Sequence, residues 1–279
     1  MTPAERASAV AFAIRNCALE GLAPSDGMMA LAASHEAGHA GVDALVDFAR
    51  NERAEADATG DVAGSSAAGR EHAGGEGAAS GKAGIDARTV RADRVFANTV
   101  ALAEHGWKGS GDLDELVAIH AALYDGVFAD AGRLRTEDAP RVGSSAHAAG
   151  TPMSFFPAQL IETGAANLSS QLAEQRNLKA LDRPDFVRAL ATIYDELGYL
   201  HPFLGGNASV LRMFASRLSH FAGWDLDWGL VSRDEYRAAK QRAYAGDTAG
   251  FEAMFDRIVR PANPSRVFLV AGWDQGPAH

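Results

Sequence analysis

Apolar side chains recur every three or four residues along most of this chain, and this spacing constrains its fold more than any other feature. An α-helix turns once in about 3.6 residues, so side chains at that spacing gather on one helical face. Much of the 47% hydrophobic share is alanine, with few β-branched or aromatic residues, which favours helices over sheets. The chain is therefore predicted to be all-α. The main stripes are Leu113, Leu116, His120, Leu123, Tyr124 and Val127; Phe186, Leu190, Ile193, Tyr194 and Leu197; and Leu211, Phe214, Leu218 and Phe221.

Composition divides the chain into three stretches. Residues 1–51 are expected to form three short helices, the first ending near Gly21, since glycine commonly ends a helix. Residues 52–90 are rich in Gly, Ala and Ser and hold too little large apolar surface to offset ordering entropy, so we expect a flexible linker. Residues 91–279 are expected to form a larger helical unit, interrupted by a loop or short β-hairpin over 141–157.

Charge and cysteine content argue against several classes of protein. A net charge of −10 disfavours a broad nucleic-acid surface, because such surfaces neutralise phosphates with lysine and arginine. Any nucleotide is expected to be held locally. The single cysteine, Cys17, has no partner for an internal disulfide, and we expect neither a secretory signal nor a membrane span. A reducing cytoplasm is the predicted location, and the oligomeric state stays open.

The segment His201–Asn207 separates two amphipathic stretches, the second of which is expected to begin near Ala208. The N–H groups at a helix start are free and lie at the positive end of the helix dipole, so they bind anions. The glycines at 205 and 206 let a phosphate approach the backbone closely. Arg212 lies one turn inside the helix, and His201 could accept a proton from a hydroxyl. The segment therefore predicts a phosphate site beside a general base.

The stretch HPFLGGNASVLR, from His201 to Arg212, resembles the Fic motif HxFx(D/E)GN(G/K)RxxR. Fic domains are small helical folds that move a nucleotide-derived group onto a protein hydroxyl. The resemblance implies a Fic-type core at 91–279, ATP or another nucleotide as donor, and a protein substrate with a Ser, Thr or Tyr hydroxyl. It covers about residues 95–260, through Gly132–Thr136, Phe155–Pro157, Ala222–Trp228 and Tyr236–Phe255.

The resemblance also implies a role for each part of the motif. The histidine is the general base, the phenylalanine anchors the loop, the glycine–asparagine pair forms an anion hole, and the last arginine grips the outer phosphates. An aromatic–proline segment resembles the flap that aligns the target. The residues concerned are His201 as base; Phe203 as anchor; Gly205, Gly206, Asn207, Ser209 and Arg212 at the nucleotide; and Phe155, Phe156 and Pro157 in the flap.

Three positions depart from the family motif. Gly205 stands where the family carries a metal-binding acid, Ala208 where it has Gly or Lys, and Ser209 where it has its first arginine. Losing one cation that stabilises the transition state costs on the order of 100-fold or more in rate. The sequence therefore leaves two interpretations open, an adenylyltransferase-like enzyme with an altered motif and an impaired Fic domain that acts as a binding or regulatory module. It also leaves the need for Mg²⁺ open.

The N-terminal stretch carries a second resemblance. Residues Ile14–Gly21, IRNCALEG, are similar to the inhibitory motif (S/T)xxxE(G/N) of Fic antitoxins, with Asn16 in place of the Ser or Thr. By that similarity, Glu20 pairs with Arg212 and occupies the space that an ATP γ-phosphate needs. An inhibitory segment in the same chain acts at an effective concentration of about a millimolar through a flexible linker. The sequence does not decide between inhibition in cis and in trans.

A third hypothesis comes from His35-Glu36-Ala37-Gly38-His39, a formal HExxH motif. On a continuous helix both histidines would face one side as zinc ligands, and Glu36 would activate a water. The string lies in a short helical segment, Gly38 weakens its helix, and no third ligand is evident. A zinc metalloprotease is thus the least favoured of the three functions, and no metal site is predicted.

Overall fold

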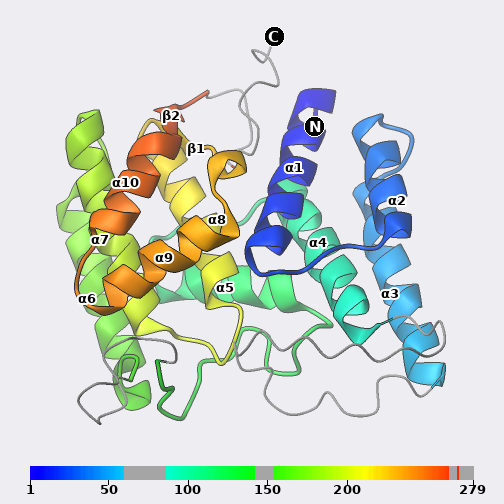
Figure 1. Cartoon of the computed structure of the whole chain (residues 1–279), viewed down its shortest axis with the longest axis horizontal. Helices are drawn as coiled ribbons and strands as arrows, with labels where there is room; N and C mark the ends of the chain where they lie inside the picture. The colour runs from blue at the N-terminus through cyan, green and yellow to red at the C-terminus, as the bar shows by residue number, and fades with distance from the viewer. Residues whose placement is uncertain (60–85, 142–153, 264–268, 270–279) are drawn as a thin grey trace.

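The computed structural model describes residues 1–59, 86–141, 154–263 and 269. In this part of the chain helices dominate, joined by one two-stranded antiparallel sheet and an isolated bridge between Pro140 and Ser154 (Figure 1). The all-α prediction is confirmed. The expected hairpin falls mostly on residues 142–153, outside the described residues. The elements are α1 Pro3–Leu19, α2 Asp26–Glu36, α3 Val42–Thr59, α4 Ala87–His105, α5 Leu113–Tyr124, η2 Ala158–Leu160, α6 Ile161–Glu174, η3 Arg176–Leu178, α7 Arg183–Leu200, α8 Asn207–Phe221, β1 Trp224–Leu226, η4 Trp228–Leu230, α9 Arg233–Tyr244, α10 Ala249–Ile258 and β2 Val259–Pro261.

Helices α1, α2 and α3 form the N-terminal part, as the sequence predicts. The start of α1 is fixed by a capping box, in which the Thr2 hydroxyl accepts from the Glu5 N–H and the Glu5 carboxylate accepts from the Thr2 N–H. Helix α3 runs to Thr59, beyond the expected start of the linker at residue 52, and α4 begins at Ala87. Residues 60–85, the middle of the expected linker, lie outside the described residues.

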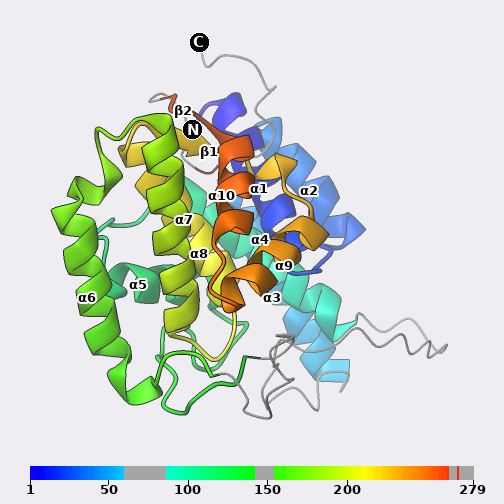
Figure 2. The same cartoon turned by 60° about the vertical axis from the view of Figure 1, so that its left-hand side comes forward.

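Helix α4 joins the N-terminal helices to the rest of the fold. Its side chains from Val95 to Val100 are all buried, because α1, α3 and α5 pack against it. Figures 1 and 2 show α1–α4 gathered at one end of the molecule and α5–α10 at the other. The N-terminal segment therefore packs directly on the larger unit, and α1 also contacts η4 and α9.

Helix α8 lies at the centre of the larger unit. Every side chain from Asn207 to Ser219 is buried, since α5, α7 and β1 pack around this helix. A helix that is enclosed on all sides cannot show one clean apolar stripe. The loop that precedes α8, residues 201–206, enters the same core through Phe203, which is almost fully buried.

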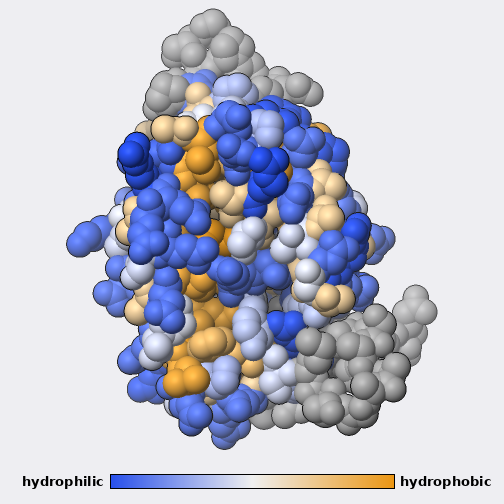
Figure 3. All heavy atoms as spheres, turned by 90° about the vertical axis from the view of Figure 1, so that its left-hand side faces the viewer, coloured by the Kyte–Doolittle hydropathy of each residue, from blue (hydrophilic) through white to orange (hydrophobic). Residues whose placement is uncertain are grey.

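Strands β1 and β2 pair antiparallel in the larger unit, with Trp224 opposite Pro261 and Leu226 opposite Val259. Trp228 follows β1 and is fully buried, and its indole N–H donates to the Ser216 hydroxyl at 2.8 Å. Figure 3 shows a narrow strip of apolar side chains among hydrophilic ones on the side where α6 and α7 lie. Within the described residues, no helix has the length and apolar content needed to cross a membrane.

Candidate active site

The loop between α7 and α8 turns sharply at both of its ends. His201 ends α7 with a left-handed backbone at φ 45°, and Gly206 precedes α8 at φ 76°. A methyl group at Gly206 would lie 2.6 Å from the Tyr124 hydroxyl oxygen and nearer still to the ring, so only glycine fits. The free N–H groups of the first turn of α8 therefore follow a glycine that brings the backbone close to its neighbours, the geometry expected of an anion site.

Asn207 holds the His201 ring in one orientation, with Nε2 as a hydrogen-bond acceptor. Asn207 Oδ1 accepts from the Phe203 N–H at 3.0 Å, which places the Asn207 amide NH₂ on the other side, 2.8 Å from the Phe203 carbonyl oxygen and 3.0 Å from His201 Nε2. An amide NH₂ can only donate, so Nε2 is the acceptor and the ring is neutral. Burial, and then the charges of Lys240, Arg135 and Arg141, lower the pKa of His201 to about 3.

The predicted flap contacts this histidine directly. The Phe155 ring stacks on the His201 ring, with 3.7 Å between centroids and 8° between planes. Phe156 is half-buried, and its N–H donates to the Tyr199 carbonyl at 3.1 Å. Pro157 precedes η2. Phe155 thus packs over the predicted base, which the sequence did not indicate, and the docking of a target remains a prediction for all three residues.

Arg135, from the segment Gly132–Thr136, ties the flap to the loop. Its guanidinium is almost fully buried and donates to the carbonyls of His201 at 2.7 Å, Leu200 at 3.3 Å and Phe156. Its own backbone N–H donates to the Pro202 carbonyl at 2.9 Å. One arginine therefore fixes the end of α7, the start of the loop and the flap relative to one another.

Arg212 is completely buried and is occupied by α1. Its Nε donates to Asn16 Oδ1 at 2.7 Å, and its Nη2 donates to the Glu20 carboxylate and to the Ser209 hydroxyl, the latter at 3.1 Å. Glu20 caps the C-terminal end of α1, and its side chain is 23% exposed. The structure thus brings together four residues that the sequence predicted, from parts of the chain almost 200 residues apart.

Two tyrosines, Tyr236 and Tyr194, lie near the same arginine. The Arg212 guanidinium lies 5.2 Å from the centre of the Tyr236 ring, and the Tyr236 and Tyr194 hydroxyls are 2.7 Å apart. Burial alone would lower the pKa of Arg212, but the charge of Glu20, followed by smaller contributions from Tyr236 and Tyr194, outweighs burial, and the pKa lies above its ordinary value. Arg212 Nη1 is buried and has no hydrogen-bond partner among the described residues.

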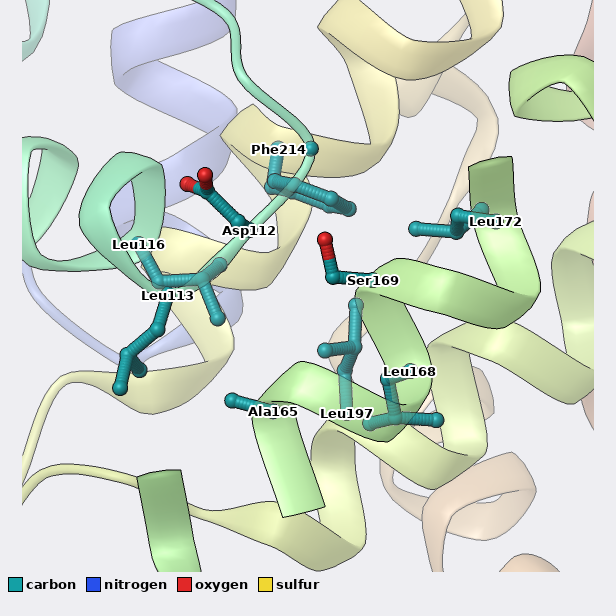
Figure 4. Close-up of a pocket in the computed structure, with 10 residues that line it drawn as sticks. Asp112, Leu113, Leu116, Ala165, Leu168, Ser169, Leu172, Leu197 and Phe214 are labelled. Atoms are coloured by element: carbon teal, nitrogen blue, oxygen red, sulfur yellow. The ribbon is translucent and has the colours of Figure 1, made fainter. Parts of the chain in front are cut away.

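A recess opens beside these residues, between α7, α8, α9 and α10. His201 and Asn207 lie at its wall. The small hollow in Figure 4, between α5, α6, α7 and α8, contains none of the predicted site residues. The other residues that line the first recess are Tyr194, Asp195, Gly198, Ala208, Leu211, Tyr236, Lys240, Ala243, Tyr244 and Phe251.

The HExxH string does not form a zinc site in this structure. Helix α2 ends at Glu36, and Gly38 has a left-handed backbone at φ 79°, so the helical spacing that the motif requires is broken between its two histidines. His35 is buried with Nδ1 3.1 Å from the Ala40 carbonyl oxygen, whereas His39 is exposed. Among the described residues no group of three or more His, Cys, Asp or Glu side chains could hold a metal ion.

Comparison with known proteins agrees with this geometry. The model of the Fic/DOC family matches residues 110–219. The chain is 31% identical over 153 residues to "Probable protein adenylyltransferase Fic" of Escherichia coli K12, covering 55% of this chain and 72% of that protein. This chain belongs to the Fic/DOC family. It is also 31% identical over 173 residues to "Protein adenylyltransferase VbhT" of Bartonella schoenbuchensis, but the match covers 61% of this chain and only 34% of VbhT.

Solved structures show the same fold. The N-terminal Fic domain of a Bartonella quintana effector, solved with bound ADP, matches with a TM-score of 0.56 and 22% identity, covering 62% of this chain and 84% of that one. BepC of Bartonella tribocorum, solved with bound AMPPNP, matches with the same TM-score and 22% identity, covering 62% and 86%. The Fic-type helical core is thus confirmed as a fold.

The three departures from the Fic motif have different surroundings. Gly205 offers only its backbone, and its carbonyl oxygen lies 3.1 Å from His120 Nε2. Ala208 lines the recess. Ser209 is fully buried and accepts a hydrogen bond from Arg212, so it serves the arginine that remains. Sequence reasoning missed His120, because it read this residue as part of an apolar stripe.

Proposed function

We propose that this protein is a Fic-type nucleotidylyltransferase that its own N-terminal helix holds inactive through Glu20. One observation carries the proposal: Arg212, the buried arginine behind the phosphate loop, is paired with Glu20 of the same chain while His201 presents an unprotonated nitrogen. The names of the E. coli and Bartonella relatives support adenylyl transfer, and the bound ADP and AMPPNP of the solved Fic domains support a nucleotide donor.

The reaction would use groups that the site already orients. The phosphates bind the first turn of α8 and Arg212, where N–H groups, the helix dipole and a guanidinium converge. His201 Nε2 takes the proton of the target hydroxyl, and the hydroxyl oxygen forms a bond to the α-phosphorus of the nucleotide. The bond from that phosphorus to the leaving group, pyrophosphate when ATP is the donor, breaks in the same step. The proton then passes from His201 to solvent.

The residues present do not fit the divalent cation that a Fic acid would hold. Gly205 has no side chain to offer as a ligand at that position. We therefore assign no step to a metal. A donor whose leaving group needs less charge stabilisation than pyrophosphate would suit this loop best.

The contacts of Arg212 support inhibition in cis. Two of its three nitrogens donate to α1, through Asn16 and Glu20, so a phosphate must compete with both residues. Removing the Glu20 carboxylate leaves a buried cation without its counter-charge, and an incoming phosphate restores that charge. Removing the Glu20 carboxylate should therefore both free Arg212 and make phosphate binding there more favourable.

A second candidate is a Fic domain that binds nucleotide without transferring it. The observation in its favour is the loss of the acid at Gly205 together with the loss of the first arginine at Ser209. In that case Glu20 would regulate binding alone. The same experiment separates the two candidates.

Label transfer to lysate proteins tests the proposal. We expect Glu20→Gly to transfer label from at least one of ATP, GTP, UTP and CTP, and to add the corresponding nucleotide mass to Ser, Thr or Tyr in mass spectra. The double variant Glu20→Gly/His201→Ala should lose this transfer, because no other group in the loop accepts the proton. Binding of nucleotide without any transfer would favour the second candidate, and transfer that survives His201→Ala would remove His201 from the mechanism.

A further inference from the structure

A histidine outside the motif holds the phosphate loop from behind. His120 lies on α5 and is almost fully buried, and its ring stacks on Phe203 with 3.9 Å between centroids and 18° between planes. Its Nε2 lies 3.1 Å from the Gly205 carbonyl oxygen, and its Nδ1 accepts from the Gly132 N–H at 2.8 Å. Both ring nitrogens and one ring face are thus in use.

These partners fix the proton on the ring. A backbone N–H can only donate, so Nδ1 must be the acceptor and Nε2 carries the hydrogen that is donated to the Gly205 carbonyl. A protonated ring would lose the hydrogen bond from Gly132. Burial, only partly opposed by the hydrogen bond to Gly205 and the charge of Asp130, lowers the pKa of His120 to about 4, which keeps this neutral form at physiological pH.

The loop needs such a hold because of its composition. Gly205 and Gly206 are consecutive, and glycine has the freest backbone of all residues, so the peptide between them could rotate. The described residues contain no cis peptide bond. In a trans peptide the carbonyl and the following N–H point in opposite directions. Holding the Gly205 carbonyl toward α5 therefore directs the Gly206 N–H away from α5, free of that helix.

We propose that His120 is a positioning residue, which sets the orientation of the Gly205–Gly206 peptide so that its N–H is available to a bound phosphate. The inference rests on the proposed function for its catalytic consequence, but its structural part can be tested without activity. This hold matters more in this chain because residue 205 is glycine, which has no side chain to restrict the backbone. Tyr124, which approaches the Gly206 carbonyl at 3.4 Å, gives weaker support from the same helix.

Nuclear magnetic resonance of the ¹⁵N-labelled wild-type protein tests the hold itself. We expect the His120 shifts to show a protonated Nε2 and an unprotonated Nδ1 at pH 7, and to remain so at pH 5. The amide of Gly206 should shift in His120→Phe, which keeps the ring stack but loses both hydrogen bonds. A Nδ1-protonated ring, or a Gly206 amide unchanged in His120→Phe, would overturn the proposal whether or not the protein is an enzyme.

Transfer kinetics in the Glu20→Gly background test the consequence. His120→Phe should lower kcat about tenfold with little change in the KM for the protein target, because a misdirected N–H weakens phosphate positioning by about one hydrogen bond. His120→Gln, whose amide can both donate and accept, should recover part of the loss. Leu116→Ala, which destabilises the same helix without touching the loop, is the control and should keep its kcat below its melting temperature. Equal losses in His120→Phe and Leu116→Ala would show that His120 acts only through stability.

Discussion

Two histidine motifs in this chain have opposite outcomes. In the first, His35 is buried and His39 is exposed, because α2 ends between them. In the second, the helix break at His201 is itself the useful feature, since the turn brings Asn207 back onto the histidine and places Arg212 behind the loop. The comparison teaches that motif spacing predicts chemistry only when the backbone through the motif takes the form that the chemistry needs.

Glycine substitution is the strongest way to break this comparison. Gly206→Ala should lower the free energy of unfolding by about 3 kcal/mol, because the residue has φ 76° and its new methyl group would collide with the Tyr124 ring. Gly41→Ala, next to the HExxH string, has open space around it and should change stability by less than about 1 kcal/mol. Chemical denaturation measures both. Similar costs at the two positions would contradict the claim that position 206 requires glycine.

Acid should lower the stability of the protein through the two buried histidines at the loop, His120 and His201. The pKa values of His120 and His201 in the folded protein, about 4 and about 3, lie below the ordinary value of 6.5. As pH falls below 6.5 the unfolded chain binds protons first, so stability is complete above that pH and is lost down to about pH 4 for His120 and about pH 3 for His201. The His120 contribution is about 3 kcal/mol. Denaturation from pH 7 to 4 should give a smaller loss in His120→Gln than in wild type, while His39→Ala, an exposed control, should follow wild type.

The ion pair between α1 and α8 offers a more modest effect. Glu20→Gly should lower the free energy of unfolding of the nucleotide-free protein by about 2 kcal/mol, because Arg212 is fully buried and loses its counter-charge. Glu20→Gln keeps a hydrogen-bond acceptor but no charge, so its free energy of unfolding should lie between those of wild type and Glu20→Gly. Added nucleotide should raise the melting temperature of Glu20→Gly more than that of wild type. A Glu20→Gly protein as stable as wild type would show that the pair is not a restraint.

The smallest effect is expected at the HExxH string. Metal analysis of protein purified without added zinc should find no stoichiometric Zn²⁺, and His39→Ala should change neither metal content nor stability, since His39 is exposed and lies beyond the end of α2. Near-equimolar zinc that is lost in His39→Ala would reverse the ranking of the two motifs.

Helical spacing was enough to predict the fold class and the three N-terminal helices, but it placed some side chains wrongly. Ile14 is apolar but exposed, whereas the polar Asn16 on the same helix is buried, where it accepts a hydrogen bond from Arg212. Phe221 is also exposed, since it lies at the last turn of α8, beyond the enclosed part of the helix. Which face is covered depends on neighbours distant in the sequence.

The residues of the candidate site also differ in whether the sequence could predict them. Residues fixed by a local motif, such as His201 and Asn207, could be predicted from the sequence. Residues that reach the loop or Arg212 from other helices could not, because His120 on α5 and Tyr236 on α9 have no spacing that links them to the motif. A histidine within an otherwise apolar stripe was the one available signal for His120, since a buried imidazole requires partners.

The central claim is that Arg212 serves two partners in turn, Glu20 and a phosphate. Calorimetric titration of ATP, GTP, UTP and CTP into wild type, Glu20→Gly and Glu20→Gly/Arg212→Ala tests it most directly. The account predicts that Glu20→Gly binds at least one nucleotide about tenfold or more tightly than wild type, since the phosphate replaces a charged hydrogen-bond partner, and that the double variant loses this gain. Equal affinity in wild type and Glu20→Gly for every nucleotide, or a gain that survives Arg212→Ala, would contradict it.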